Sequence, residues 1–213
     1  MHTKQIYNLI ILDESGSMQS IKSAIISGFN EVVQTAKGVE AQFPEQEHYI
    51  SLLSFNGMGI KKIHDRDRAA DLQEIDARSY QPIASTPLYD AIGQGILTLK
   101  NAIADCQNCH VLVTILTDGE ENASKEFNHA QIKLLIEKMK AAAWTFTYIG
   151  ANHDVAKVAI SLSIENSLHF KATLEETRAM FEKEKSAKAS YFQKLSRNED
   201  VSKGYYDDDD KKA

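Results

Sequence analysis

Apolar and polar residues alternate along this chain in blocks that predict strands and helices in turn. Residues 5–12 form an apolar run rich in Ile and Leu, as in a buried strand. Across residues 18–37 the apolar residues lie three and four positions apart, which predicts a helix with one broad apolar stripe. That stripe consists of Met18, Ile21, Ala24, Ile25, Phe29, Val32 and Val33. A buried strand therefore leads into an amphipathic helix.

Two further strands are predicted around a tight turn. The segments 48–55 and 60–64 are separated by Asn56-Gly57, a strong hairpin signal. Charged residues are interleaved in the second segment, as in an edge strand. Residues 65–87 are polar and irregular, so we expect them to connect this hairpin to the next helix.

The second half of the chain repeats the alternation. A helix is expected from Pro87 or Leu88 to about Ala104, with Thr86 placed to cap it and Pro87 in its first turn. The elements expected after it are a strand at 110–116, a helix near 123–142, a strand at 144–149, a short helix near 153–162, a short strand near 167–170 and a helix at 173–198. Apolar residues are sparse in the middle of that last helix, which favours a solvated face there.

This alternation predicts an α/β fold with three layers. We expect a doubly wound, mostly parallel central sheet with one antiparallel edge strand and helices on both faces. Residues 1–200 would form a single domain, which suits a chain of 213 residues. Residues 201–213 read as an acidic, disordered tail, and its end, DDDDKKA, also has the form of a protease-cleavage tag. A native origin of that segment fits equally well.

Composition narrows the classes of function. Hydrophobic residues make up 43% of the chain and charged residues 25%, as in an ordinary soluble domain. The formal net charge is −6 and no basic stretch offsets it, which argues against a nucleic-acid partner. The first apolar run is too short to span a membrane and is not followed by a small-residue cleavage site. We therefore expect a cytoplasmic protein with no membrane partner.

The two cysteines lie in CQNCH, residues 106–110, which matches the attachment pattern of c-type haem. Haem attachment of this kind requires export, and His110 leads directly into the apolar run of a predicted strand. A redox-active dithiol is a second possibility for this spacing. Two reduced thiols flanking a turn are the simplest interpretation.

Oxygen-bearing side chains gather where predicted strands end. Asp13, Ser15 and Ser17 follow the first strand, Thr86 precedes the middle helix, and Asp118 follows the strand at 110–116. In open α/β sheets, ligands bind outside the carboxyl ends of the strands. Acid and hydroxyl oxygens without His or Cys favour a hard cation, Mg²⁺ or Mn²⁺, over zinc or copper. These five residues are the candidate metal ligands.

Each cluster also has a purely structural explanation. Asp-x-Ser-x-Ser before a helix can satisfy the free N–H groups of the first turn. Thr86-Pro87 starts a helix without any ion, and Thr117-Asp118-Gly119 is a common turn. The three clusters together, in this order on this fold, favour the metal.

The set Asp13-x-Ser15-x-Ser17, Thr86 and Asp118 resembles the metal-ion-dependent adhesion site of the von Willebrand factor A (vWA) family, which includes the integrin I domains. The resemblance covers residues 5–170 or beyond, and TPLYDAI is closer to the family's bacterial and intracellular branch than to its adhesion receptors. It implies that the hydroxyls of Ser15 and Ser17 bind the metal directly. The Thr86 hydroxyl would do so in the ligand-occupied state, and Asp13 and Asp118 would act mainly through metal-bound water.

Coordination chemistry predicts how such a site would be used. Mg²⁺ keeps several waters, and neutral hydroxyl ligands quench little of its charge. Carboxylates that orient the waters leave the ion attractive to an outside carboxylate. We therefore expect a protein-binding module in which the metal captures an Asp or Glu side chain of a partner protein.

Two other functions are alternatives to this one. A metal-dependent hydrolase of the phosphatase type would resemble the haloacid dehalogenases, but these need a second acid two positions after the nucleophile, where this chain has Ser15. No dinucleotide fingerprint, P-loop or nucleophile elbow is present. The other alternative is a scaffold subunit that binds through its C-terminal helix. We expect a binding protein and not an enzyme.

Overall fold

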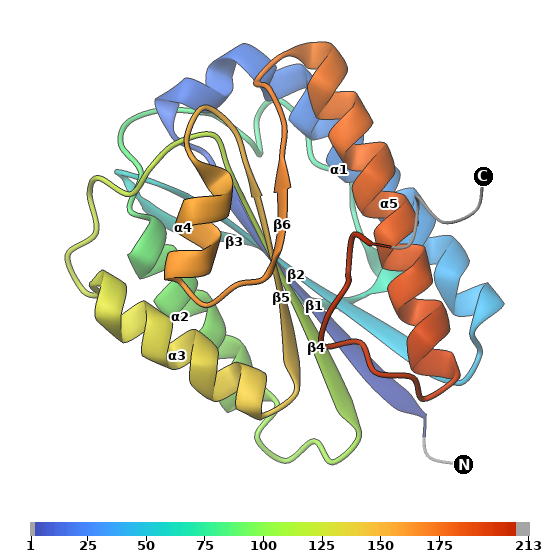
Figure 1. The fold of residues 1–213 in the computed structure, drawn as a ribbon. Helices are drawn as coiled ribbons and strands as arrows, with labels where there is room; N and C mark the ends of the chain where they lie inside the picture. Colours follow the sequence, from blue (N-terminus) through green and yellow to red (C-terminus); the bar gives the residue numbers. More distant parts are fainter. Residues whose placement is uncertain (1–2, 208–213) are drawn as a thin grey trace.

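The computed structural model describes residues 3–207 and has a six-stranded sheet at its centre (Figure 1). The strands are β1 (Lys4–Asp13), β2 (Gln46–Asn56), β3 (Gly59–Arg68), β4 (Cys109–Thr117), β5 (Trp144–Gly150) and β6 (Asn166–His169). Their order across the sheet is β3-β2-β1-β4-β5-β6. Only the β2–β3 pair is antiparallel among these strands. The expected mostly parallel sheet with one antiparallel edge strand is confirmed.

Helices cover both faces of the sheet and complete a three-layer α/β fold (Figure 1). The α-helices are α1 (Lys22–Gln42), α2 (Leu88–Ala102), α3 (His129–Ala141), α4 (Val155–Ser161) and α5 (Leu174–Ser196), and short 3₁₀ helices η1 (Gly16–Ile21) and η2 (Ala69–Asp71) join them. Helices α2, α3 and α4 pack on one face and α1 and α5 on the other. None of the described helices is long and apolar enough to cross a membrane.

The apolar run of β1 supplies both layers of the core, which explains its lack of alternation. Leu9 and Ile11 face the layer of α2, whereas Ile10 and Leu12 face the layer of α1. Each is almost completely buried. Burying one such side chain stabilises the fold by about 1.5–3 kcal/mol, so β1 contributes to the core on both faces of the sheet.

The helix expected at 123–142 begins later, at His129. Its start is set by reciprocal hydrogen bonds between the side chains and backbone N–H groups of Asn128 and Gln131. The residues before it remain a loop because the Asp90 carboxylate in α2 accepts the backbone N–H groups of Lys125, Glu126 and Phe127 at 2.8–2.9 Å. The side chain of Asp90, distant in sequence, therefore accepts backbone N–H groups that would lie within α3 if the helix began earlier.

Two expectations about the C-terminal part are corrected. The middle of α5 is not a solvated face, because Glu184 and Lys188 are buried and lie 3.5 Å apart as an ion pair. The tail does not begin at residue 201 either. Tyr205 is buried against α5, and its hydroxyl, like that of Tyr206, donates to the Glu184 carboxylate. The domain thus extends beyond residue 200, while residues 208–213 lie outside the described part.

The cysteines are not two separate thiols as expected. Cys106 and Cys109 form a disulfide, with Cα atoms 6.0 Å apart, across the turn that enters β4. That separation lies in the usual range for disulfides. The turn lies at the amino end of β4, whereas the candidate metal ligands lie at the carboxyl ends of the strands. The disulfide and these ligands are therefore at opposite ends of the sheet.

Candidate metal centre

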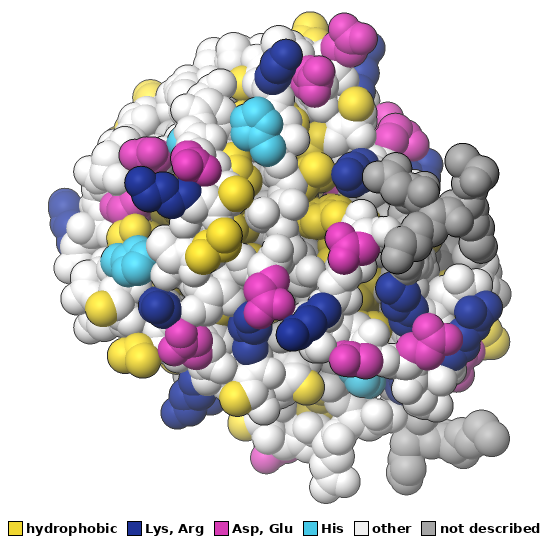
Figure 2. Space-filling model, in the orientation of Figure 1, with side chains coloured by type: hydrophobic (Ala, Val, Ile, Leu, Met, Phe, Trp, Pro, Cys, Tyr) yellow, Lys and Arg dark blue, Asp and Glu magenta, His cyan; other side chains and the backbone are white. Residues whose placement is uncertain are grey.

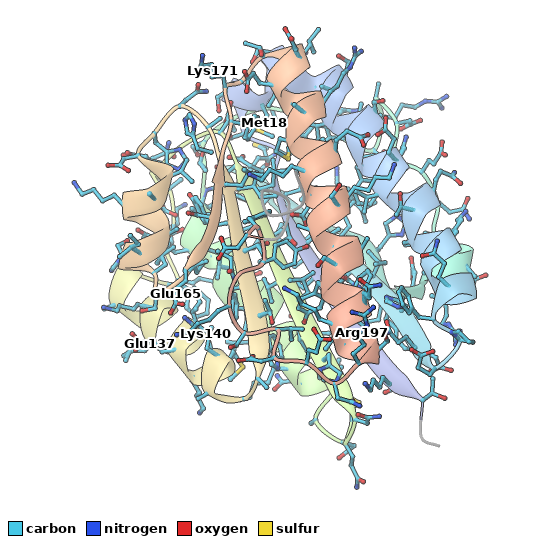
Figure 3. All side chains as sticks on the ribbon, turned by 45° about the vertical axis from the view of Figure 1, so that its right-hand side comes forward. Met18, Glu137, Lys140, Glu165, Lys171 and Arg197 are labelled. Carbon is cyan, nitrogen blue, oxygen red and sulfur yellow. A yellow bond between two sulfur atoms is a disulfide. The ribbon has the colours of Figure 1, made fainter. Side chains whose placement is uncertain are left out.

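The carboxyl ends of β1 and β4 bring the candidate ligands together. These strands are parallel neighbours paired up to Leu12 and Leu116, so Asp13 and Thr117 end them side by side. Ser15 and Ser17 follow on the loop into η1, and Asp118 follows β4 directly. Met18, the next residue after Ser17, lies in Figure 3 at the end of the molecule opposite to Arg197. The centre therefore occupies one tip of the domain.

The Asp13 carboxylate is completely buried and is held by two donors. Its Oδ1 accepts the backbone N–H of Ser15 at 2.7 Å, and its Oδ2 accepts the hydroxyl of Thr117 at 2.6 Å. The Tyr80 hydroxyl donates to the Asp13 carbonyl at 2.7 Å. These contacts fix the carboxylate at the junction of β1 and β4.

The two serine hydroxyls link Asp13's loop to Asp118. Ser15 Oγ and Ser17 Oγ lie 3.2 Å apart, and Ser17 Oγ donates to Asp118 Oδ1 at 2.5 Å. Ser15 and Asp118 are buried, whereas Ser17 is exposed. The hydroxyls therefore lie between the acid of the β4 loop and solvent.

Thr86 reaches the same place from the start of α2. A Cβ on Gly119 would lie 3.8 Å from Thr86 Oγ1 and 3.9 Å from Ser17 Oγ, which places both hydroxyls over this glycine. The backbone of Thr86 is fixed by Asn122, whose side chain accepts the Thr86 N–H at 2.9 Å. Thr86 was expected to cap α2, but Pro87 is the N-cap residue. This leaves the hydroxyl of Thr86 for the centre.

Partners in the β4–α3 loop satisfy the first turn of α2 instead. Glu121 Oε2 accepts the N–H of Tyr89 at 2.9 Å, and Ser124 Oγ accepts that of Asp90 at 3.1 Å. Glu121 also accepts the N–H groups of the two residues that follow Asn122. Its carboxylate thus holds the loop against α2.

Both carboxyl groups of the centre resist ionisation. Burial raises the pKa of Asp13 from 3.8 to about 6, against the lowering effect of its hydrogen bonds, and the Asp118 charge raises it further. Burial also raises the pKa of Asp118. Removing a carboxylate from water disfavours its charged form, and two nearby carboxylates disfavour each other's. A cation between the two carboxylates would favour their charged forms and lower the pKa of both.

The donor set fits a hard divalent cation. Asp118 Oδ2 is buried and has no hydrogen-bond partner among the described residues. An unsatisfied buried carboxylate oxygen costs free energy that a cation or its bound water would recover. Among the described side chains, no three acidic, His or Cys groups converge on one point, and the candidate set here consists of two carboxylates and three hydroxyls. Such an all-oxygen set suits Mg²⁺ or Mn²⁺.

Three supporting residues were missed in the sequence. Thr117 and Tyr80 bind the side chain and carbonyl of Asp13, and Glu14 is buried beside them with Lys61 3.2 Å from its carboxylate. Thr117 could have been found from its place next to Asp118. Tyr80 reaches Asp13 only through the fold, and no local pattern marks it.

Comparisons with known proteins bear on the fold. No family model matches the chain, and no curated protein matches it either. Among solved structures, the VWA domain of SpRpn10 aligns over 82% of this chain and 92% of its own length, at 11% identity and a TM-score of 0.54. The fold described above is therefore similar to that of a VWA domain.

The fold is vWA-like. The pilus adhesin SpaC from Lactobacillus rhamnosus GG in its open conformation aligns over 90% of this chain and 31% of its own, at 13% identity and a TM-score of 0.65. The PilB minor pilin from Streptococcus sanguinis, as its D319A mutant, aligns over 92% of this chain and 63% of its own, at 13% identity and a TM-score of 0.56. The chain spans less than two thirds of both pilus proteins, and these identities establish the vWA-like fold alone.

Proposed function

We propose that this vWA-like domain binds Mg²⁺ or Mn²⁺ at the tip of its sheet and captures an acidic side chain of a partner protein through the ion. The hydroxyls of Ser15, Ser17 and Thr86 would bind the metal, and Asp13 and Asp118 would orient its waters. The bound ion supplies a positive charge with a coordination position open to an outside carboxylate. The observation that carries the proposal is the buried, unpartnered Oδ2 of Asp118, whose Oδ1 accepts the hydroxyl of Ser17.

Several features support a protein partner over other ligands. The two pilus proteins of similar fold are named as an adhesin and a minor pilin. On the face shown in Figure 2, positive and negative side chains are interspersed and not gathered by sign, unlike a surface that binds nucleic acid. We also propose that the domain is not an enzyme, since Ser15 stands where a phosphatase of the type considered would need its second acid.

Calorimetric titration with MgCl₂ and MnCl₂ tests the metal site. Wild type should bind one ion, and Thr86→Ala and Asp13→Ala should each weaken binding about 10- to 100-fold. Thr98→Ala is the matched control because Thr98 is exposed further along α2. Equal binding by wild type and Asp13→Ala would disprove the assignment.

A display library of random peptides tests carboxylate capture. Peptides with a fixed central Asp should be retained in Mg²⁺ and lost in chelator, and peptides with Asn at that position should not be retained. A parallel screen of phosphatase and esterase substrates with metal present tests catalysis. Turnover that Asp13→Asn abolishes would overturn the binding-only function.

A further inference from the structure

Two exposed apolar side chains lie beside the metal centre. Met58 in the β2–β3 hairpin is 82% exposed, and Ile83 in the segment before α2 is 57% exposed. The other large apolar side chains exposed among the described residues are Leu134 on α3, Ile160 on α4 and Leu174 at the start of α5. Large apolar side chains left in solvent next to a binding site are a mark of an interaction surface.

Backbone contacts connect these side chains to the loop that carries the serines. The N–H of Ile83 donates to the Glu14 carbonyl at 2.9 Å, and that of Gly16 donates to the Ala84 carbonyl at 3.0 Å. The segment 83–84 therefore pairs with the residues between Asp13 and Ser17. Ile83 is held at a fixed position relative to the centre.

The turn of the β2–β3 hairpin packs closely against the same segment, at Ala84 and Ser85. A Cβ on Gly57 would lie 2.4 Å from Ser85 Oγ and 3.2 Å from the Ala84 Cβ, so only glycine allows this approach. Met58 follows directly and lies in the same two-residue turn. Met58 and Ile83 thus border one side of the centre, and we call them the apolar rim.

The segment under the apolar rim is held in a fixed conformation. Ala84 has a φ of +64°, in the left-handed region that residues with a Cβ rarely adopt. Such a conformation costs about 1 kcal/mol or more and persists where surrounding contacts impose it. The backbone next to Ile83 is therefore held in place before a partner binds.

The opposite side of the centre carries one exposed acidic side chain. Glu120 is exposed and follows Gly119 in the loop after β4. Strands β2 and β3 lie on one side of β1 in the sheet, and β4 lies on the other. The metal centre at the end of β1 therefore lies between the apolar rim and Glu120.

We infer that the partner segment has three parts: one Asp or Glu for the ion, an apolar side chain on the flank that meets Met58 and Ile83, and Lys or Arg on the flank that meets Glu120. This inference rests on the proposed function. Burial of apolar surface would add affinity, and the flexible thioether of Met58 adapts to different apolar shapes. Glu120 would select by charge, because an acidic flank would be repelled. A second copy of this chain fits less well, since each copy carries a net charge of −6.

The Asp-centred display library tests this inference when it is selected in Mg²⁺ against surface variants. Wild type should enrich peptides with apolar residues on one flank and Lys or Arg on the other. The double variant Met58→Ser/Ile83→Ser should lose the apolar preference and bind wild-type-selected peptides about tenfold more weakly by fluorescence anisotropy. Glu120→Lys should change the charged flank from basic to acidic, and Leu134→Ser, exposed on α3, should change neither.

The outcomes separate this inference from the function on which it rests. Mg²⁺-dependent retention of Asp peptides without any flank preference would overturn the inference and leave the proposed function intact. Failure to retain Asp peptides in Mg²⁺ would overturn both. Mg²⁺-dependent dimerisation that Met58→Ser abolishes, measured by sedimentation, would replace the partner segment with a second copy of the chain.

Discussion

Asp13 is completely buried at the end of β1, and its pKa of about 6 lies well above the ordinary carboxyl value of 3.8. Burial is the main cause, and the charge of Asp118 adds to it. At neutral pH the metal-free domain must therefore hold an ionised carboxylate in an unfavourable environment. A cation bound at the proposed site would offset this cost to stability.

Replacing Asp13 with Asn should stabilise the metal-free protein near neutral pH. Because the folded pKa is raised, the contribution of Asp13 to stability is fully present below 3.8 and is lost as pH rises through about 6. In chelator, Asp13→Asn should match wild type near pH 4 and exceed its free energy of unfolding by about 1–3 kcal/mol above about pH 7. Urea denaturation across this pH range measures the difference.

Two comparisons complete this test. Mg²⁺ should raise the Tm of wild type and raise that of Asp13→Asn by less, since the variant loses a charge that favours the ion. Asp105→Asn, at an exposed position, should match wild type in both its stability and its response to Mg²⁺. A metal-free Asp13→Asn protein that is less stable than wild type at neutral pH would show that the carboxylate serves the fold.

For single residues, the sequence predicted which side chains lie together at the candidate metal centre. It did not predict the hydrogen bonds that hold them there. Asp13, Ser15 and Ser17 are close in sequence, so their spacing and the strand before them were enough to propose one loop. Asp118 follows a second apolar strand, and the parallel-sheet rule placed it at the same edge. Tyr80 reaches Asp13 from an irregular segment, and that contact depends on tertiary packing that no periodicity encodes.

Among the elements, α5 departs most from its sequence pattern. Its middle stretch reads as solvent-exposed, yet Glu184 and Lys188 are buried. The partners that make this burial possible are distant in sequence: Tyr205 and Tyr206 donate to the two oxygens of Glu184 at 3.0 and 2.9 Å. The start of α3 was likewise misplaced because its loop is held by Asp90 of α2. Local patterns located these helices, and distant side chains determined their ends and exposure.

Glu184→Ala should destabilise the domain strongly. The substitution leaves the Lys188 ammonium and two tyrosine hydroxyls without their carboxylate in a buried site, and breaking a buried pair in this way costs about 3–5 kcal/mol. Glu184→Gln should cost less because its amide oxygen still accepts one hydrogen bond. Urea denaturation followed by circular dichroism measures both.

The neighbouring lysine provides the control for this prediction. The side chain of Lys185 is 43% exposed, and its contact with Glu182 is 4.0 Å long. Lys185→Ala should therefore change the free energy of unfolding by no more than about 0.5 kcal/mol. If Glu184→Ala were as mild as Lys185→Ala, the buried ion pair would contribute nothing to the position of α5.

For the whole molecule, alternation of apolar blocks was sufficient to predict three layers, because a parallel sheet requires crossover helices on its faces. It did not predict where the domain ends. Residues 201–207 contain few apolar side chains, but Tyr205 packs with Ile6, Leu112 and Tyr191 in the core beneath α5. This cluster lies under the first half of β1, whereas the metal centre lies at the strand's far end. Stability and metal binding should therefore respond separately to changes in the C-terminal segment.

Truncation tests this separation. A chain that ends at Lys203 loses Tyr205 and Tyr206 and should lose about 3–5 kcal/mol of stability, as expected when a large buried aromatic side chain is removed. A chain that ends at Asp207 keeps every described contact of both tyrosines and should match the full chain. Where the shorter protein remains folded, its Mg²⁺ affinity by calorimetry should equal that of the full chain, because neither tyrosine contacts the centre.

The truncation should also be non-additive with Glu184→Ala, since each removes the same two hydrogen bonds. Combined, they should cost less than the sum of their separate effects, by about 1–3 kcal/mol. The four-protein cycle in urea measures this coupling, with Lys185→Ala in place of Glu184→Ala as the uncoupled reference. Strict additivity would mean that the tyrosines stabilise the domain only by apolar burial. A Lys203 truncation as stable as the full chain would place the domain boundary back near residue 200.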